Sequence, residues 1–256
     1  MKRLPLWRRP YRARRILEIG PGHNPFKGAT HLLEMDVHEG RERGGNALQV
    51  PDAAKLIVGK ADTLPFEAGT FDYVYASHVL EHVEEPERAC REILRVGKAG
   101  YIETPSPFLE QGLALRDETS PEHWFHRWFV FASEPNRLIF EPKTPAQVSW
   151  FCSCPDGQFL KEFYASVDFR AAQHCFRRTA KTTIFYWQGS FEVEVRQKGA
   201  DCRTDGRPCR FAGMRAMLVD SCRDFFRSHR ILRLKREFPD CASVFRKYGH
   251  ATMWIG

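Results

Sequence analysis

Short apolar runs recur along the first hundred residues, and a segment with helical periodicity separates the last two. The runs that we expect to form strands are Arg15 to Ile19, His31 to Val37, Leu56 to Gly59, Phe71 to Ser77, and Tyr101 to Thr104. Pro86 to Val96 places Ala89, Ile93, Leu94 and Val96 on one side, which predicts an amphipathic helix. Strands that alternate with helical connections predict an α/β fold with a doubly wound, mainly parallel sheet.

The pattern changes beyond Phe108. Leu138 to Glu141 is a candidate for a short strand, and Thr182 to Trp187 followed by Ser190 to Val195 has the pattern of a hairpin turning at Gln188 and Gly189. Arg210 to Arg227 has the apolar spacing of an amphipathic helix. We therefore expect a basic arm at 1–15, a main domain at 16–197 with an insertion at 108–180, and a basic helical extension at 198–256.

The first candidate ligand-binding residues lie where the first strand ends. They are Glu18, Gly20, Pro21 and Gly22. Glycines let the backbone approach a ligand closely, as in the nucleotide sites of α/β proteins. The second apolar run ends in Asp36, an acid that could accept hydrogen bonds from ribose hydroxyls. The segment from Gly22 to His31 contains Pro25 and further glycines, so we expect a short turn there in place of a full helix.

A third group of motifs carries a family resemblance. Residues 61–66 read ADTLPF, and residues 70–83 read TFDYVYASHVLEHV. With the glycine turn and Asp36, these motifs resemble the class I S-adenosylmethionine-dependent methyltransferases, in particular the methyltransferase type 11-like group, over residues 14–106. The resemblance implies a Rossmann-like sheet whose last two strands are antiparallel, and the predicted hairpin is the candidate for them.

The resemblance also implies S-adenosyl-L-methionine as the cofactor. By motif position, the residues expected to bind it are Glu18, Gly20, Pro21, Gly22, Asp36, Asp62, Thr63, Leu64 and Ser77. The strand-one turn would face the methionine moiety, Asp36 the ribose, and Asp62 to Leu64 the adenine.

Histidines are the candidate catalytic groups. His78 follows the fourth strand, and His123 and His126 lie in a segment with four aromatic side chains, which could form an acceptor pocket on a helix or could simply pack in the core. If the acceptor is a hydroxyl, neutral imidazole should take its proton, and activity should rise through about pH 6 to 7.

Metal sites are the competing interpretation of some of these residues. His78, Glu81 and His82 would share one face at the start of a helix, as in metal-dependent enzymes that methylate the 2′-hydroxyl of small RNAs, with His123 or His126 as a distant ligand. Packing or capping roles would serve equally well, and we predict no metal. Cys152, Cys154, Cys202 and Cys209 fit no common zinc spacing, so free thiols are expected.

Charge and the length of apolar runs bear on the possible partners and the location of the protein. The 256 residues are 43% hydrophobic, and the net charge of +7 gathers at the two ends: seven basic residues lie in 1–15, and 14 basic against 6 acidic residues lie in 196–256. Such ends could bind an anionic group or RNA, or could be solvated charge. No apolar run is long enough to span a membrane, and we expect a cytoplasmic protein.

These observations and the resemblance predict an enzyme that methylates a small-molecule or glycan-type acceptor, with a hydroxyl as the favoured group and an amine as the alternative. The basic ends and the His/Glu set leave a second hypothesis, an RNA 2′-O-methyltransferase. The shortened segment after Gly22 leaves a third, a non-catalytic binding subunit with the same fold.

Overall fold

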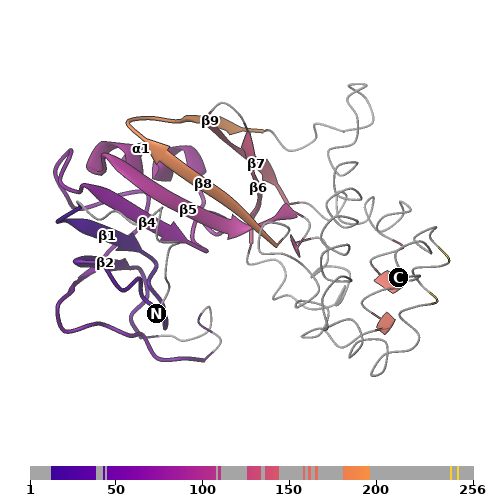
Figure 1. The fold of residues 1–256 in the computed structure, drawn as a ribbon, viewed down its shortest axis with the longest axis horizontal. Coiled ribbons are helices and arrows are strands. Elements are labelled where there is room, and N and C mark those ends of the chain that lie inside the picture. Colours follow the sequence, from indigo (N-terminus) through magenta and orange to yellow (C-terminus); the bar gives the residue numbers. More distant parts are fainter. Residues whose placement is uncertain are drawn as a thin grey trace, which may run out of the picture. The chain divides into compact units, whose positions relative to one another are not determined.

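The computed structural model describes residues 13–38, 43, 45–107, 109–110, 126–133, 136–143 and 181–196, with seven single positions between 158 and 247 (Figure 1). The chain divides into two compact units. The first comprises 1–104, 130–141 and 184–196, and the second comprises 105–129, 142–183 and 197–256. The candidate cofactor residues all belong to the first unit.

A six-stranded sheet in the order β3-β2-β1-β4-β5-β8 organises the first unit (Figure 1). Its strands are β1 (Ile16–Ile19), β2 (His31–Glu34), β3 (Lys55–Val58), β4 (Tyr73–Ser77), β5 (Ala99–Pro105) and β8 (Thr182–Gln188). The five strands from β1 to β5 are joined by parallel pairings. The predicted parallel sheet is thus confirmed, with strand ends displaced by a few residues.

The register of these strands places polar side chains on one sheet face near its carboxyl edge. Glu18 pairs with Leu32 on one side and with Tyr75 on the other, and Ser77 pairs with Glu103. Because side chains alternate along a strand, four residues near the strand ends share this face: Glu18, Glu34, Ser77 and Glu103. Ligands of open α/β sheets bind at this edge.

Behind these polar ends, the same face carries an aromatic core. Phe26 stacks on Tyr75 with ring centroids 4.8 Å apart, and Tyr75 stacks on Tyr101 at 4.9 Å. Phe26 comes from the turn segment after β1, and its side chain is buried. The described residues 21–30 form turns and contain no helix, which confirms the prediction of a short connection. Phe26 provides the apolar cover over this part of the sheet.

Helix α1 (Pro86–Val96) matches its predicted bounds. Proline at its first position suits the fixed backbone angle of a helix start, and Ala89, Cys90, Ile93 and Val96 are buried. A Cβ added at Gly97 would lie 2.5 Å from Cγ2 of Val74. The helix therefore ends against the sheet face that carries Val74, opposite the face with the tyrosines.

The predicted hairpin is wrong in its pairing. The turn at Gly189 exists, but β8 joins the six-stranded sheet while β9 (Glu192–Val195) joins a three-stranded sheet in the order β6-β7-β9. The other members are β6 (Trp128–Ser133) and β7 (Arg137–Pro142), and β9 pairs with β7 in parallel. Arg137 makes an ion pair with Glu192 at 2.6 Å, which favours this register.

Among the helices of the described residues, none is long and apolar enough to cross a membrane. The predicted helix at Arg210 to Arg227 and the two basic ends, apart from a few single residues, lie outside the described residues. The domain boundaries that we expect from the sequence therefore stay predictions.

Candidate active site

The glycine turn at the end of β1 has a backbone that only glycine adopts without strain. Gly20 and Gly22 have φ of +64° and +57°, and the Gly20 N–H donates to the carbonyl of Leu33 at 2.9 Å. A Cβ added at Gly20 would lie only 2.5 Å from Cγ2 of Val79. The turn is thus packed against the segment that follows β4, with no room for a side chain.

Two acidic side chains of the sheet accept backbone hydrogen bonds from this turn and the segment after it. Glu18 is fully buried and accepts the Phe26 N–H at 2.6 Å. Glu34, the last residue of β2, accepts the Gly22 N–H at 3.3 Å. The sequence analysis assigned no role to Glu34. An acidic residue that ends a strand next to a glycine turn could have indicated this contact with the turn backbone.

Asp36, the predicted ribose ligand, lies two residues beyond the end of β2. Its Oδ1 accepts the His38 N–H at 2.9 Å, which fixes the carboxylate in a local turn. Asp36 and the glycine turn follow neighbouring strands of the sheet, because β1 pairs with β2. Binding of ribose by Asp36 stays a prediction.

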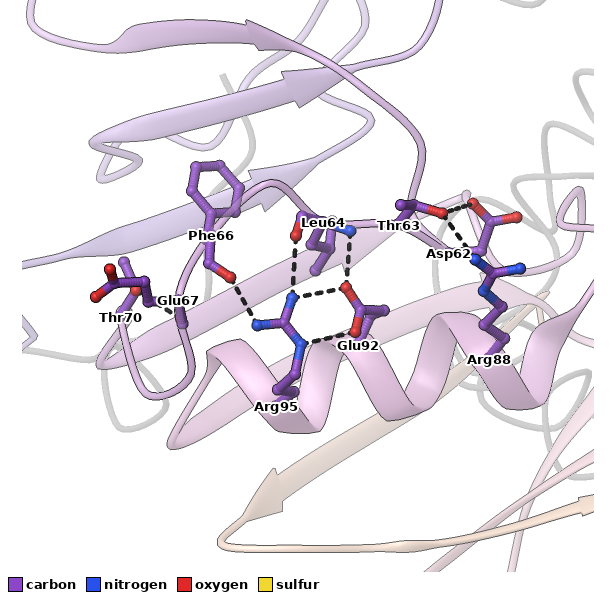
Figure 2. A network of polar contacts seen from close by, with 9 residues as sticks. All are labelled: Asp62, Thr63, Leu64, Phe66, Glu67, Thr70, Arg88, Glu92 and Arg95. Atoms are coloured by element: carbon purple, nitrogen blue, oxygen red, sulfur yellow. Dashed lines mark hydrogen bonds and ion pairs between the residues drawn. The ribbon is translucent and has the colours of Figure 1, made fainter.

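The segment from Asp62 to Phe66 is attached to α1 by a polar network (Figure 2). Glu92 accepts the Leu64 N–H at 2.8 Å, and Arg95 donates to the carbonyls of Phe66 at 2.6 Å and Leu64 at 3.0 Å. Arg95 also pairs with Glu92 at 2.7 Å, which is the main reason that the pKa of Glu92 lies below its ordinary value. The helix therefore fixes the backbone of a predicted adenine-binding segment.

We expect Arg95→Ala to lower the free energy of unfolding by about 1 to 2 kcal/mol, because two carbonyls and Glu92 lose a charged donor. Affinity for S-adenosylhomocysteine should fall as well, since the carbonyls of Leu64 and Phe66 lose the hydrogen bonds from Arg95. Urea unfolding and calorimetry measure the two effects.

Arg91→Ala is the matched control on the same helix. Its partner is Glu87 at 3.3 Å, and both side chains are more than 60% exposed. Such surface pairs contribute little, so we expect a change within about 0.5 kcal/mol. Equal effects of the two variants would show that the Arg95 network does not support the segment.

The segment after β4 brings a histidine between two buried carboxylates. His78 Nδ1 lies 3.2 Å from Oε1 of Glu81, and Nε2 lies 3.6 Å from Oε1 of Glu103. The His78 N–H donates to the Glu103 carbonyl at 2.8 Å, and the Tyr101 hydroxyl donates to the Glu103 side chain. His78 has φ of +59°, a strained value for a residue other than glycine. Strain of this kind is typical of functional sites.

The two carboxylates change the expected protonation of His78. Burial alone would lower its pKa, but the contacts with Glu103 and Glu81 and their negative charges raise the pKa to about 9. In the free protein at neutral pH the imidazole is therefore mostly protonated. The contacts with Glu103 and Glu81 therefore move the expected rise in activity above the range of about pH 6 to 7, and sequence reasoning did not include Glu103.

The expected helical arrangement of His78, Glu81 and His82 is also wrong. These residues form a turn in which the His82 N–H donates to the Val79 carbonyl at 3.0 Å, and α1 begins only at Pro86. The turn still brings the Glu81 carboxylate to 3.2 Å from Nδ1 of His78. Ser77, the predicted cofactor residue before them, is buried at the end of β4.

The other predicted histidines belong to the second unit. His126 Nδ1 contacts the buried carboxylate of Glu110, which also binds Lys143 at 2.6 Å. Burial opposes ionisation of Glu110, but His126 and Lys143 hold its pKa below the ordinary value. The segment that follows is strand β6, so a helix through residues 126–129 is wrong.

Several predicted residues lie outside the described residues. They are His123, Cys152, Cys154, Cys202 and Cys209. The roles proposed for them, and the binding of an anionic group or RNA by the basic ends, stay predictions.

The turn after β1 fits the cofactor that the resemblance implies. Glycine at positions 20 and 22 leaves the turn without side-chain atoms of its own there, and the side chains nearest to the two Cβ positions are Val79 and Arg43. The nearby carboxylates Glu18 and Glu34 suit a ligand that carries an ammonium and a sulfonium. The residues present are therefore compatible with S-adenosylmethionine in charge.

Comparisons with known proteins identify the family of the chain. The family model described as a methyltransferase domain matches residues 20–102. The demethylmenaquinone methyltransferase of Clavibacter sepedonicus is 30% identical over 179 residues, which cover 64% of this chain and 69% of that protein. The sterol 4-C-methyltransferase of Caenorhabditis elegans is 24% identical over 183 residues, which cover 70% of this chain but only 51% of that protein.

Among solved structures, a methyltransferase from Thermotoga maritima is 24% identical, with a TM-score of 0.35, and the match covers 45% of this chain and 56% of that one. The residues that match the family model include Gly20, Gly22, Asp36 and the segment after β4, and the Clavibacter relative reaches 30% identity over most of its own length. The chain therefore belongs to the class I S-adenosylmethionine-dependent methyltransferases.

Proposed function

We propose that the protein methylates a hydroxyl of a small-molecule or glycan-type acceptor and that His78 removes the hydroxyl proton. The observation that carries this proposal is the position of His78 directly after β4, between Glu81 and Glu103. A small acceptor is supported by the names of two relatives, which act on demethylmenaquinone and on a sterol.

The geometry supports different roles for the two ring nitrogens. Oε1 of Glu81, whose side chain is only 1% exposed, lies 3.2 Å from Nδ1, so the negative charge of Glu81 favours a proton on this nitrogen. Nε2 lies 3.6 Å from Glu103, beyond good hydrogen-bond distance, so it is the nitrogen that an acceptor hydroxyl can reach. The His78 side chain is 45% exposed, which leaves it accessible.

When bound, S-adenosylmethionine supplies a methyl group on a positively charged sulfur, which departs as a neutral thioether. His78 Nε2 takes the proton of the acceptor hydroxyl, and the oxygen lone pair forms the new bond to carbon. Glu81 keeps the imidazole in the required tautomer and stabilises the imidazolium that forms. Glu103, held by the Tyr101 hydroxyl, adds a second negative charge beside that cation.

Methylation at carbon is the second candidate. One relative is a sterol 4-C-methyltransferase, and a ubiquinone/menaquinone C-methyltransferase from Ruegeria is 31% identical over 106 residues. An ionised hydroxyl next to the reacting carbon would make that carbon nucleophilic, so the same proton acceptor would serve both reactions.

The test is a methyl-transfer assay with the full chain, labelled S-adenosylmethionine, and panels of phenols, quinols, sterols and sugars. Mass spectrometry and NMR of the product distinguish an ether from a carbon-bound methyl. A methyl ether on a small acceptor is the expected product. Transfer to a carbon would favour the second candidate, and transfer to short RNA alone would contradict a small acceptor.

A further inference from the structure

An arginine from the connection between β2 and β3 covers the glycine turn. A Cβ added at Gly22 would lie 3.7 Å from Cγ and 3.8 Å from Cδ of Arg43. Gln49 from the same connection donates its N–H to the Gly22 carbonyl at 3.1 Å. Residues 21–30 contain no helix, so the stem of Arg43 packs directly on the turn.

Backbone carbonyls fix the guanidinium of Arg43. Nη1 donates to the carbonyl of Asp36 at 2.6 Å, and Nε donates to the carbonyl of Asn46 at 3.3 Å. Asn46 returns a side-chain hydrogen bond to the Arg43 carbonyl at 2.8 Å. An arginine that is already held loses little side-chain entropy when it binds a ligand.

The positive charge of Arg43 is not neutralised within the part of the chain that the structure describes. Its two hydrogen bonds go to carbonyls, and no ion pair joins it to a described carboxylate. A guanidinium has five N–H donors, so three remain for a ligand. Arg43 is half-buried, which strengthens the interaction of its charge with an anion.

The charges around the turn match an amino-acid moiety. Glu18 and Glu34 lie on the sheet below the turn and suit an ammonium group, and Arg43 lies against Gly22 and suits a carboxylate. His23 is the neighbouring alternative, but its side chain is exposed and lacks the anchoring that Arg43 has.

We propose that Arg43 binds the carboxylate of the methionine moiety of S-adenosylmethionine. This inference rests on the glycine turn as the site of that moiety, and it extends the cofactor site to the connection between β2 and β3. Charge-assisted pairing with a planar guanidinium would hold the carboxylate with two parallel hydrogen bonds.

Calorimetry of the full chain with two ligands tests the proposal. S-adenosylhomocysteine has the carboxylate, and 5′-methylthioadenosine lacks the whole amino-acid end. We expect Arg43→Ala to lower the affinity for S-adenosylhomocysteine about 10- to 100-fold. The affinity for 5′-methylthioadenosine should fall less than about threefold. Arg43→Lys should lose less affinity for S-adenosylhomocysteine than Arg43→Ala. Lysine keeps the positive charge but lacks the paired N–H donors of the guanidinium.

The control is Arg91→Ala, which removes an exposed arginine of α1 and should leave both affinities unchanged. Equal losses of both ligands in Arg43→Ala would overturn the proposal, because Arg43 would then only hold the turn. Unchanged affinity for S-adenosylhomocysteine would overturn it as well. Neither result would affect the acceptor proposal, which concerns His78 and is tested by product analysis.

Discussion

Gly20→Ala should abolish measurable cofactor binding, with affinity for S-adenosylhomocysteine at least about 100-fold below that of the native protein. Two physical effects combine. A side chain at φ of +64° is strained by about 1 to 2 kcal/mol, and the new Cβ would lie 2.5 Å from Cγ2 of Val79. Either the turn or the segment after β4 must move, and both border the site.

Two further glycine variants separate local binding from general strain. Gly69 has a similar positive φ of +66°, so Gly69→Ala strains the backbone in the same way. Nothing lies within 4 Å of the added Cβ. It should lose stability while keeping its affinity. Gly22→Ala meets only Arg43 at ordinary contact distance, so it should fold and still bind weakly. Native affinity in both Gly20→Ala and Gly22→Ala would show that the turn does not contact the cofactor.

The parallel core was predictable because its strands are buried on both faces. Residues of β1 and β4 are all buried, so these strands appear in the sequence as continuous apolar runs. Helix α1 was predictable for a similar reason, since its buried residues recur at helical spacing after a proline start. Edge strand β3 is mostly exposed, and its bounds were displaced by one residue.

Pairing between distant strands was not predictable from local pattern. The turn at Gln188 and Gly189 has hairpin chemistry, yet β9 pairs with β7, more than 50 residues earlier. That choice depends on side chains brought together by the fold, such as Arg137 and Glu192. Local turn signals specify a reversal of the chain but not which strand completes the ladder.

In the candidate site, the sequence motifs predicted the turn, Asp36 and His78. They did not predict the side chains that contact the turn and His78, such as Glu34 and Glu103. Glu103 follows Tyr101 in a strand that sequence analysis treated only as an element of the sheet. An acid inside an apolar strand was the available signal. Its effect on His78 depends on the parallel register in which Ser77 pairs with Glu103, and that register appears only in the structure.

We expect turnover to rise with pH up to about 9, and His78→Gln to lower it by roughly 100-fold at the optimum. Proton removal needs neutral imidazole, and the carboxylates of Glu103 and Glu81 raise the pKa of His78 to about 9 against the opposing effect of burial. At pH 7 most of His78 would therefore be protonated. Glu81→Gln should move the midpoint toward 6.5, measured by pH–rate profiles and imidazole NMR.

Folding stability should respond to pH in the opposite direction. The pKa of His78 is higher in the folded protein than its ordinary value of 6.5, so its stabilising contribution is complete below about pH 6.5 and is lost as pH rises through about 9. Because the side chain is 45% exposed, solvent screening limits this contribution to the order of 1 kcal/mol.

Urea unfolding across this pH range should therefore show a native advantage over His78→Gln at pH 6 that disappears by pH 10. Turnover should therefore level off once the imidazole of His78 is neutral, above about pH 9. A native imidazole that titrates at 6.5 would contradict the ion-pair assignment. Full turnover in His78→Gln would leave the histidine with a structural role only.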